Sequence, residues 1–160
     1  MDKTARRPEG DRYRPPGAAM RTTTDIKVRG YHLDLFSHVN NARYIELLEE
    51  ARWDYIEKNS IQLDEMFARG IAFNVVNITI NYRRPGKLGD VLAIDTFVSR
   101  VGNKSMTMTQ IITLKGTETR VADAEVTFVF AYMNEGKAIP IGDDIKRHWN
   151  WDDDLAGLPA

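Results

Sequence analysis

The sequence predicts an α+β protein in which an antiparallel β-sheet is wrapped around one long central helix. Three observations lead to this fold class. One long segment, from Asn40 to Lys58, repeats apolar residues at helical spacing. Four later segments alternate between apolar and polar residues, and short turns separate them, which favours antiparallel neighbours. The apolar face of such a sheet must be covered, and the long helix is the natural cover.

Before and after the long helix, the sequence predicts one strand and one short helix. A weakly alternating segment, Thr22 to Arg29, predicts the first strand. Gln62 to Arg69 predicts a short second helix, which Gly70 ends. The long helix should bury a stripe of apolar residues, which Ile45 and Trp53 widen. The stripe consists of Tyr44, Leu47, Leu48, Ala51, Tyr55 and Ile56.

The four later strands are expected to form an antiparallel meander. Their ranges are Ala72 to Tyr82, Asp90 to Val101, Ser105 to Leu114 and Thr119 to Tyr132. Breaks or turns separate them at Pro85-Gly86, Gly102-Asn103 and Lys115-Gly116. In the first of these strands, one face should carry Val76, Ile78, Ile80 and Tyr82. The last strand has the clearest alternation, with Ala122, Ala124, Val126, Phe128, Phe130 and Tyr132 on one face.

Composition indicates a single globular domain. The chain has 160 residues, of which 42% are hydrophobic and 28% charged. We expect residues 1–19 to be a disordered and dispensable extension, because they hold three of the six prolines and almost no large apolar residues. An alternative is that Met20 is the true start. Residues 20–150 should form the domain and residues 151–160 a C-terminal tail.

Charge and cysteine content exclude several kinds of protein. A net charge of −1 offers no broad basic field for nucleic acid. The absence of cysteine excludes disulfides, thiolate catalysis and Cys-ligated zinc, and it fits a cytoplasmic location. No apolar run approaches the roughly 18 residues of a membrane span, so stable membrane insertion is not expected. The three histidines, His32, His38 and His148, are not spaced as a metal-ligand set.

The most informative segment surrounds Asp34. This acid lies in a short polar loop, and the long helix opens a few residues later at Asn40 and Asn41. A carboxylate would then face free backbone N–H groups at a helix N-terminus, which suits cleavage of an activated acyl group. Simpler explanations are a solvated loop acid at Asp34 and plain helix capping by the two asparagines.

The same segment resembles a known enzyme family. Asp34, the run His38-Val39-Asn40-Asn41, Tyr44 and the stretch from Glu49 to Trp53 are similar to the signature of hotdog-fold acyl-CoA thioesterases of the 4-hydroxybenzoyl-CoA thioesterase superfamily. The resemblance extends over roughly residues 24–133. Two further stretches, Ile26 to Asp34 and Val76 to Pro85, resemble the bacterial long-chain acyl-CoA thioesterases of that superfamily.

The resemblance implies an acyl-CoA substrate, long acyl chains, no metal or organic cofactor, and a homodimer or homotetramer. It also implies that Asp34 is the nucleophile or the general base, and that the backbone N–H of Asn41 polarises the thioester carbonyl. His38 matches the histidine of a related plant motif, but Phe36 replaces the asparagine of that motif. His38 is therefore either catalytic or a residue that positions the loop, and Tyr44 is expected to line the core or the acyl pocket.

Two further groups of charged residues leave alternatives open. Glu46, Glu49 and Glu50 lie on the long helix, from which a second branch of hotdog thioesterases takes its catalytic acid; ion pairing along the helix is the simpler explanation. The cations Arg83, Arg84, Lys87 and Lys104 would suit the phosphates of coenzyme A, or they form a solvated rim.

The sequence also permits two other functions. One is a hotdog hydratase or dehydratase that acts on acyl thioesters, and the other is a non-catalytic acyl-CoA-binding module. An apolar cleft beside the helix would be a natural acyl channel in any of these proteins. Large side chains such as Phe73 and Phe128 are available to line it, although most of the apolar residues must fill the core.

Overall fold

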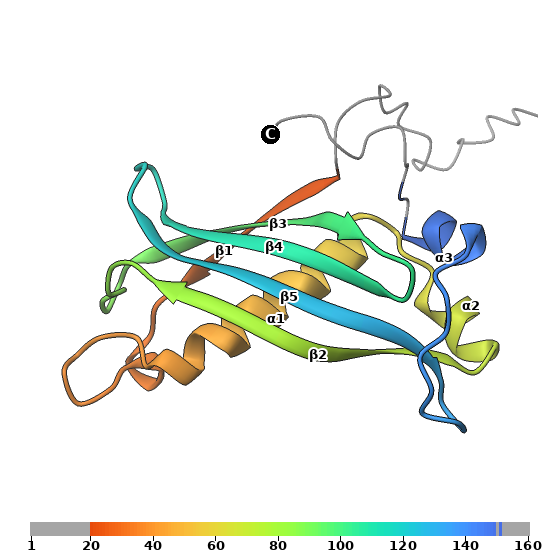
Figure 1. The fold of residues 1–160 in the computed structure, drawn as a ribbon. Coiled ribbons are helices and arrows are strands. Elements are labelled where there is room, and N and C mark those ends of the chain that lie inside the picture. The colour runs from red at the N-terminus through yellow and green to blue at the C-terminus, as the bar shows by residue number, and fades with distance from the viewer. Residues whose placement is uncertain (1–19, 150, 152–160) are drawn as a thin grey trace, which may run out of the picture.

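A five-stranded antiparallel sheet curves around one long helix in the computed structural model, which describes residues 20–149 and 151 (Figure 1). This arrangement confirms the predicted fold class. The strands are β1 (Arg21–Lys27), β2 (Ile71–Tyr82), β3 (Val91–Val101), β4 (Ser105–Leu114) and β5 (Arg120–Tyr132). The helices are η1 (Gly30–His32), α1 (Asn41–Lys58), α2 (Leu63–Ala68) and α3 (Asp143–His148). The expectations for residues 1–19 and for most of the tail lie outside the described residues and stay predictions.

The order of the strands differs from a simple meander. The sheet runs β1-β3-β4-β5-β2, so β3, β4 and β5 form the expected meander but β2 pairs with β5 at one edge. The prediction that β2 lies beside β3 was therefore wrong. The link 83–90 can span roughly 26 Å when extended, whereas crossing from β2 to β3 requires about 14 Å. A link of this length permits a crossover that a tight hairpin turn would forbid.

A β-bulge in β2 corrects the predicted face of that strand. The pairing with β5 shifts register between Val75 and Asn77, so Val75 lies opposite Phe128 and Val76 is the extra residue. Val75, and not Val76, consequently joins Ile78, Ile80 and Tyr82 on the face that looks toward α1. Strict alternation cannot reveal such a shift, because Val75 and Val76 are both apolar.

The buried stripe of α1 is the one predicted from its spacing. Its six members are all buried against the sheet: Tyr44, Leu47, Leu48, Ala51, Tyr55 and Ile56. Ile45 and Trp53 were expected to widen this stripe, but they are 39% and 44% exposed in the single chain. The sheet covers only one side of the helix, so these two side chains face outward on its other side.

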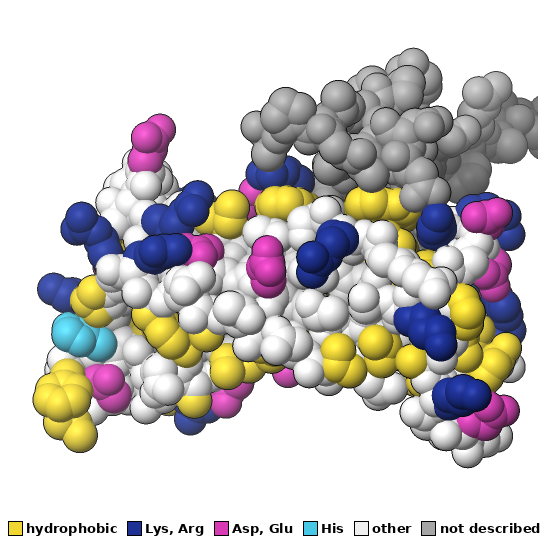
Figure 2. All heavy atoms as spheres, in the orientation of Figure 1, with side chains coloured by type: hydrophobic (Ala, Val, Ile, Leu, Met, Phe, Trp, Pro, Cys, Tyr) yellow, Lys and Arg dark blue, Asp and Glu magenta, His cyan; other side chains and the backbone are white. Residues whose placement is uncertain are grey.

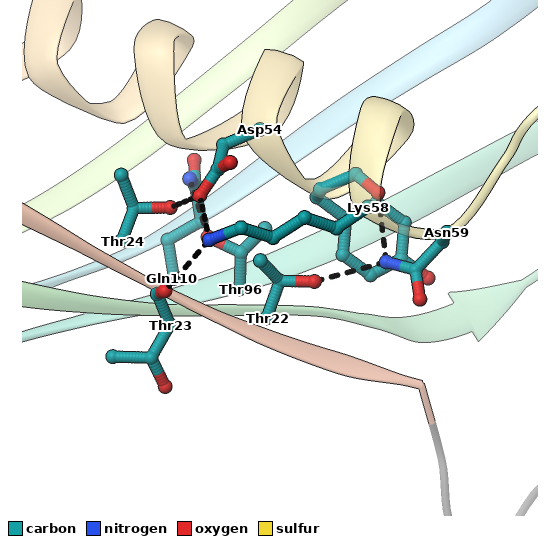
Figure 3. Close-up of polar contacts among 9 residues, drawn as sticks. Thr22, Thr23, Thr24, Asp54, Lys58, Asn59, Thr96 and Gln110 are labelled. Carbon is teal, nitrogen blue, oxygen red and sulfur yellow. Dashed lines mark hydrogen bonds and ion pairs between the residues drawn. The ribbon is translucent and has the colours of Figure 1, made fainter. Parts of the chain in front are cut away.

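The side of α1 that faces β1 is joined to the sheet by hydrogen bonds (Figure 3). Asp54 accepts from Thr24 and pairs with Lys58 at 2.6 Å. The buried Asn59 donates from Nδ2 to the hydroxyl of Thr22 at 2.9 Å and to the carbonyl of Tyr55 at 2.7 Å. This polar seam fixes the helix relative to the edge strand β1.

The segment after β5 folds back onto the end of the sheet that carries α2. Asp144 of α3 pairs with Arg69 at 2.6 Å, and His148 contacts Glu65 of α2 at 3.0 Å. The following residue, Trp149, is 1% exposed and packs among the rings of Phe73, Phe128 and Phe130. The C-terminal segment thus completes the second half of the core, a role that its sequence did not reveal. None of the described helices is long and apolar enough to cross a membrane.

Candidate active site

The loop between β1 and α1 holds Asp34 in a fixed orientation. The Asp34 backbone N–H donates to the carbonyl of His38 at 2.8 Å, and its carbonyl accepts from Ser37 at 3.1 Å. Its Oδ1 accepts from the backbone N–H groups of Phe36 at 2.8 Å and His38 at 3.1 Å. Asp34 Oδ2 accepts no hydrogen bond within the described part of the chain. One carboxylate oxygen therefore anchors the side chain, and the other remains for chemistry.

The N-terminus of α1 divides its N–H groups between capping and a possible ligand. Asn40 is the N-cap, since its Oδ1 accepts from Ala42 N–H at 2.9 Å and its carbonyl accepts from Arg43 N–H at 2.9 Å. Within residues 20–149 and 151, the N–H of Asn41 donates to nothing. The cap thus leaves free the N–H that the resemblance assigned to the thioester carbonyl, and a helix N-terminus favours negative charge at that point.

Two tyrosines build the wall beside the helix N-terminus. The hydroxyl of Tyr82 donates to the carbonyl of Asn41 at 3.0 Å, and the buried hydroxyl of Tyr44 accepts from Gly86 N–H at 3.0 Å. Their rings meet edge to face, with centroids 5.5 Å apart. Burial raises the pKa of the Tyr44 phenol above its ordinary value, so this group stays neutral near pH 7. Tyr44 therefore forms part of the wall of the cleft and supplies no charge.

These groups line a cleft of about 300 Å³ at the end of the molecule where β2 ends and α1 begins. In Figure 2 this end lies at the left, and hydrophobic and charged side chains lie next to one another on its surface. The structure brings together six of the eight predicted site residues in the lining of the cleft: Asp34, His38, Asn41, Tyr44, Arg83 and Arg84. The imidazole of His38 makes no hydrogen bond among the described residues. The bonds from His38 that hold Asp34 come from the main chain, which any residue could supply, so both roles of the imidazole stay predictions.

The neighbouring cations differ in their availability. Arg83 is held by Asp123, with its Nε 2.7 Å from Oδ1, and this contact lowers the pKa of the Asp123 carboxyl. Arg84 lines both the Asp34 cleft and an adjoining hollow of about 210 Å³, which Lys87 also lines. The Arg84 and Lys87 side chains make no ion pair within the described residues. These two cations are thus the free ones at the mouth of the site.

The structure does not bring Lys104 to this cleft. It lies in the turn between β3 and β4, at the opposite end of the sheet and roughly 30 Å away along the strands of one chain. Of the helix acids, Glu46 is paired with Arg43 at 2.6 Å, and Glu49 borders a separate apolar cleft. None of the three helix acids, Glu46, Glu49 and Glu50, lines the Asp34 cleft.

The structure reveals site residues that the sequence did not single out. Tyr82 was recognised only as an apolar strand residue, although its position next to the Arg83-Arg84-Pro85 break was a signal that it ends the strand. A second cleft beside α1 is lined mostly by apolar side chains, including Phe73, Phe128 and Trp149. Nothing in the local sequence around Trp149 indicates that it reaches the helix, because the contact depends on how the C-terminal segment folds back.

A curved antiparallel sheet around one helix, with a fixed carboxylate at the helix N-terminus, defines a hotdog-fold enzyme of the thioester-cleaving class. The thioesterase-like superfamily matches residues 28–148, and the chain belongs to this family. The predicted enzyme class, a thioester hydrolase, and the predicted hotdog architecture are thereby confirmed. The expected membership of the hotdog-fold acyl-CoA thioesterases is confirmed as well.

Individual relatives agree with this assignment. The chain is 50% identical over 124 residues to the long-chain acyl-CoA thioesterase FadM of Escherichia coli, which covers 78% of this chain and 93% of FadM. It also resembles the crystal structure of YbaW, a probable thioesterase from Escherichia coli, with 49% identity and a TM-score of 0.74 over 79% of this chain and 94% of YbaW. A 1,4-dihydroxy-2-naphthoyl-CoA thioesterase from Synechocystis shares the fold, with a TM-score of 0.72 and 17% identity over 86% of this chain and 97% of that protein.

Proposed function

We propose that this protein hydrolyses long-chain fatty acyl-CoA to a free fatty acid and coenzyme A, with Asp34 as the catalytic carboxylate. The single observation that supports this most is that Asp34 and Asn41 line the same cleft. Within the described residues, neither Asp34 Oδ2 nor the Asn41 N–H makes a hydrogen bond. The similarity to a long-chain acyl-CoA thioesterase supports the substrate class.

The proposed chemistry uses each polar group once. Oδ2 of Asp34 either takes a proton from a water that attacks the thioester carbon, or attacks that carbon itself and forms a mixed anhydride that water then hydrolyses. In both routes the C–S bond breaks and coenzyme A leaves as a thiolate that takes up a proton, and both routes need an ionised carboxylate at the start. The Asn41 N–H and the positive end of α1 stabilise the oxyanion that develops on the carbonyl oxygen. Backbone N–H groups hold Oδ1, so the carboxylate is oriented before substrate arrives, which lowers the entropic cost of reaction.

The coenzyme A part of the substrate would extend out of the cleft, past the cationic side chains at its mouth. Arg84 lies between the Asp34 cleft and the neighbouring hollow, and Lys87 lies beyond it. Both side chains are exposed, and guanidinium and ammonium groups are the usual partners of phosphate. We assign the coenzyme A phosphates to these two residues, while Arg83 holds β2 to β5 through Asp123.

The acyl chain would extend from the cleft along the side of α1 that faces β2. Each methylene that leaves water for an apolar surface contributes up to about 0.8 kcal/mol. kcat/KM should therefore rise with chain length until the apolar space is filled. Acyl-CoAs of about twelve carbons or more, a length taken from the family resemblance, should be hydrolysed far better than acetyl-CoA or benzoyl-CoA.

The test is release of free thiol from a series of acyl-CoAs, measured for the wild type and for Asp34→Asn. Asp34→Asn should lower kcat by at least about 10²-fold, the range for loss of a general base, with the melting temperature nearly unchanged. Asp64→Asn is a matched control, because Asp64 lies on α2 at the other end of the molecule. Retention of most activity in Asp34→Asn would overturn the assignment of the site.

A second copy of the chain is the partner that this surface suits. β2 is a twelve-residue edge strand with a neighbour on one side only, and Val76 is 57% exposed on it. Ile45 and Trp53 of α1 are also exposed on the open side of the helix. Long apolar edges of this kind are normally covered in soluble proteins. We propose a homodimer across β2, or a tetramer built from two such dimers.

A further inference from the structure

We propose that Trp149 closes the far end of the acyl channel and thereby sets the longest acyl chain that the enzyme accepts. This inference rests on the proposed hydrolysis of long-chain acyl-CoA. It gives a function to the C-terminal segment, which neither the Asp34 cleft nor the coenzyme A mouth uses.

The first support is the shape and lining of the apolar cleft beside α1. The cleft has a volume of about 70 Å³, and Ile56, Phe73, Met108 and Phe128 line it together with Trp149. A space of this size holds about five groups as large as a water molecule, which corresponds to the last few methylenes of a chain. Its walls are mostly apolar and suit a hydrocarbon end. The two charged members of the lining, Glu49 and Arg52, both belong to α1, and Arg52 already donates to Gln110 at 3.0 Å.

The second support is that this cleft and the Asp34 cleft lie along the same side of α1, the side that faces β2. The Asp34 cleft is bordered by Asn41 of α1 and Tyr82 of β2, and the apolar cleft by Ile56 of α1 and Phe73 of β2. Asn41 and Ile56 are about 22 Å apart along the helix at 1.5 Å per residue. A chain whose thioester lies at Asp34 would therefore run along α1 and meet Trp149 only if it is long.

The third support is the way in which Trp149 is held. Its ring centroid lies 5.1 Å from that of Phe128 and 5.6 Å from that of Phe73. The pair between Asp144 and Arg69 and the contact of His148 with Glu65 anchor the helix that carries it. A side chain that is buried and anchored in this way is a rigid wall, whereas a mobile one would yield to a longer chain.

The experiment compares kcat/KM across saturated acyl-CoAs from about eight to about twenty carbons in four variants. Trp149→Ala should move the optimum to longer chains, because each extra methylene that it admits raises kcat/KM by up to about fourfold. Two admitted methylenes would change the ratio between a long and a shorter chain by up to about fifteenfold. Trp149→Phe should give a smaller shift in the same direction.

Two further variants separate a length limit from general damage. Ile145→Ala removes another buried side chain of α3 that does not line the cleft, so it should lower the melting temperature without changing the ratio. Val75→Phe enlarges a cleft residue that is 46% exposed, so it should shorten the preferred chain without crowding the core. The two cleft variants must therefore shift the optimum in opposite directions.

Unchanged chain-length ratios in both Trp149→Ala and Val75→Phe would overturn the inference while leaving hydrolysis at Asp34 intact. A change in sedimentation mass without a change in the ratio would show that a second copy, and not an acyl chain, fills the cleft; the same measurement on the wild type tests the proposed homodimer. If the wild type released no thiol from any acyl-CoA, the proposed function would be wrong. The affinities of non-hydrolysable acyl-CoA thioethers of the same lengths would then decide the role of Trp149.

Discussion

The two flanks of α1 differ in how they meet the sheet. The flank that faces β1 packs closely and is joined by Asp54, Lys58 and Asn59 to the threonines of the edge strand (Figure 3). Among the described residues, the flank that faces β2 is joined to that strand by one hydrogen bond, from the Tyr82 hydroxyl to the Asn41 carbonyl, and the Asp34 cleft and the apolar cleft lie along it. The hydrogen-bonded flank fixes the helix, and the open flank keeps room for a ligand.

Size alone would have pointed to the wrong flank. The hollow between α1 and β1 has a volume of about 400 Å³, larger than the Asp34 cleft of about 300 Å³. Its lining carries four carboxylates, Asp25, Glu50, Asp54 and Glu57, and its single cation, Lys58, is already paired with Asp54. Such a surface repels an anionic ligand such as coenzyme A. Charge and free donors therefore identify the site better than volume does.

The largest effect is expected at the open flank, from removal of one backbone N–H. Asn41→Pro deletes the proposed oxyanion donor at the first position of the helix, where proline is well tolerated. The preceding residue, Asn40, already has φ −59° and ψ 139°, which suits a residue before proline. The kcat should fall by about 10²–10³-fold, the usual cost of losing one such donor.

Asn41→Ala is the matched control for this change, because it removes the side chain and keeps the N–H. It should retain most of the activity, and circular dichroism should show the same helix content in both variants. Equal kcat values for the proline and alanine variants would show that the Asn41 N–H takes no part in the reaction.

On the hydrogen-bonded flank, a substitution should affect stability and leave the reaction unchanged. Asn59→Ala leaves the buried hydroxyl of Thr22 without its donor, and it also exposes the Tyr55 carbonyl to a cavity. The free energy of unfolding should fall by about 1–3 kcal/mol, as measured by urea denaturation. Asn59→Asp keeps the shape but replaces the donor with an acceptor, so it should cost at least as much. A large loss of kcat in the folded Asn59→Ala variant would contradict the division between the flanks.

The smallest effect is expected at Asp54, and it should depend on pH. Partial burial opposes ionisation of this carboxyl, but the hydrogen bonds from Lys58 and Thr24 outweigh it and lower its pKa. The unfolded state therefore binds the proton more readily, so the stabilisation is present above about pH 4 and is lost as the pH falls through the folded-state pKa. Asp54→Asn should cost up to about 1 kcal/mol at pH 7, the range for partly exposed pairs.

Urea titrations at several pH values check this prediction, since the difference between wild type and Asp54→Asn should shrink below about pH 4. Glu57→Gln serves as the control, because the carboxylate of Glu57 forms no ion pair within the described residues. A difference that stayed constant down to low pH would mean that Asp54 acts through packing and not through its charge.

Local sequence determined the helix, the strands and the centre of the site. The i, i+3, i+4 spacing gave every member of the buried stripe of α1, and the boundaries of all five strands lie within two residues of their predicted positions. Asp34 and Asn41 could be predicted as site residues because the backbone geometry around them depends on neighbours within a few residues. A helix start and the loop before it form from local backbone bonds, so their residue types report directly on their geometry.

Only the tertiary structure decided which distant groups share a surface. It placed β2 beside β5, turned Val75 and not Val76 toward the helix, left Lys104 at the far end of the sheet and brought Trp149 under Phe128. It also showed that Asp123 forms an ion pair with Arg83, whereas Arg84 and Lys87 form none within the described residues. Each of these outcomes depends on contacts between segments far apart in the chain, which the periodicity of a single segment cannot encode. The sequence by itself thus determined the class of protein and the loop that carries Asp34, while packing decided which apolar side chains gather beside α1.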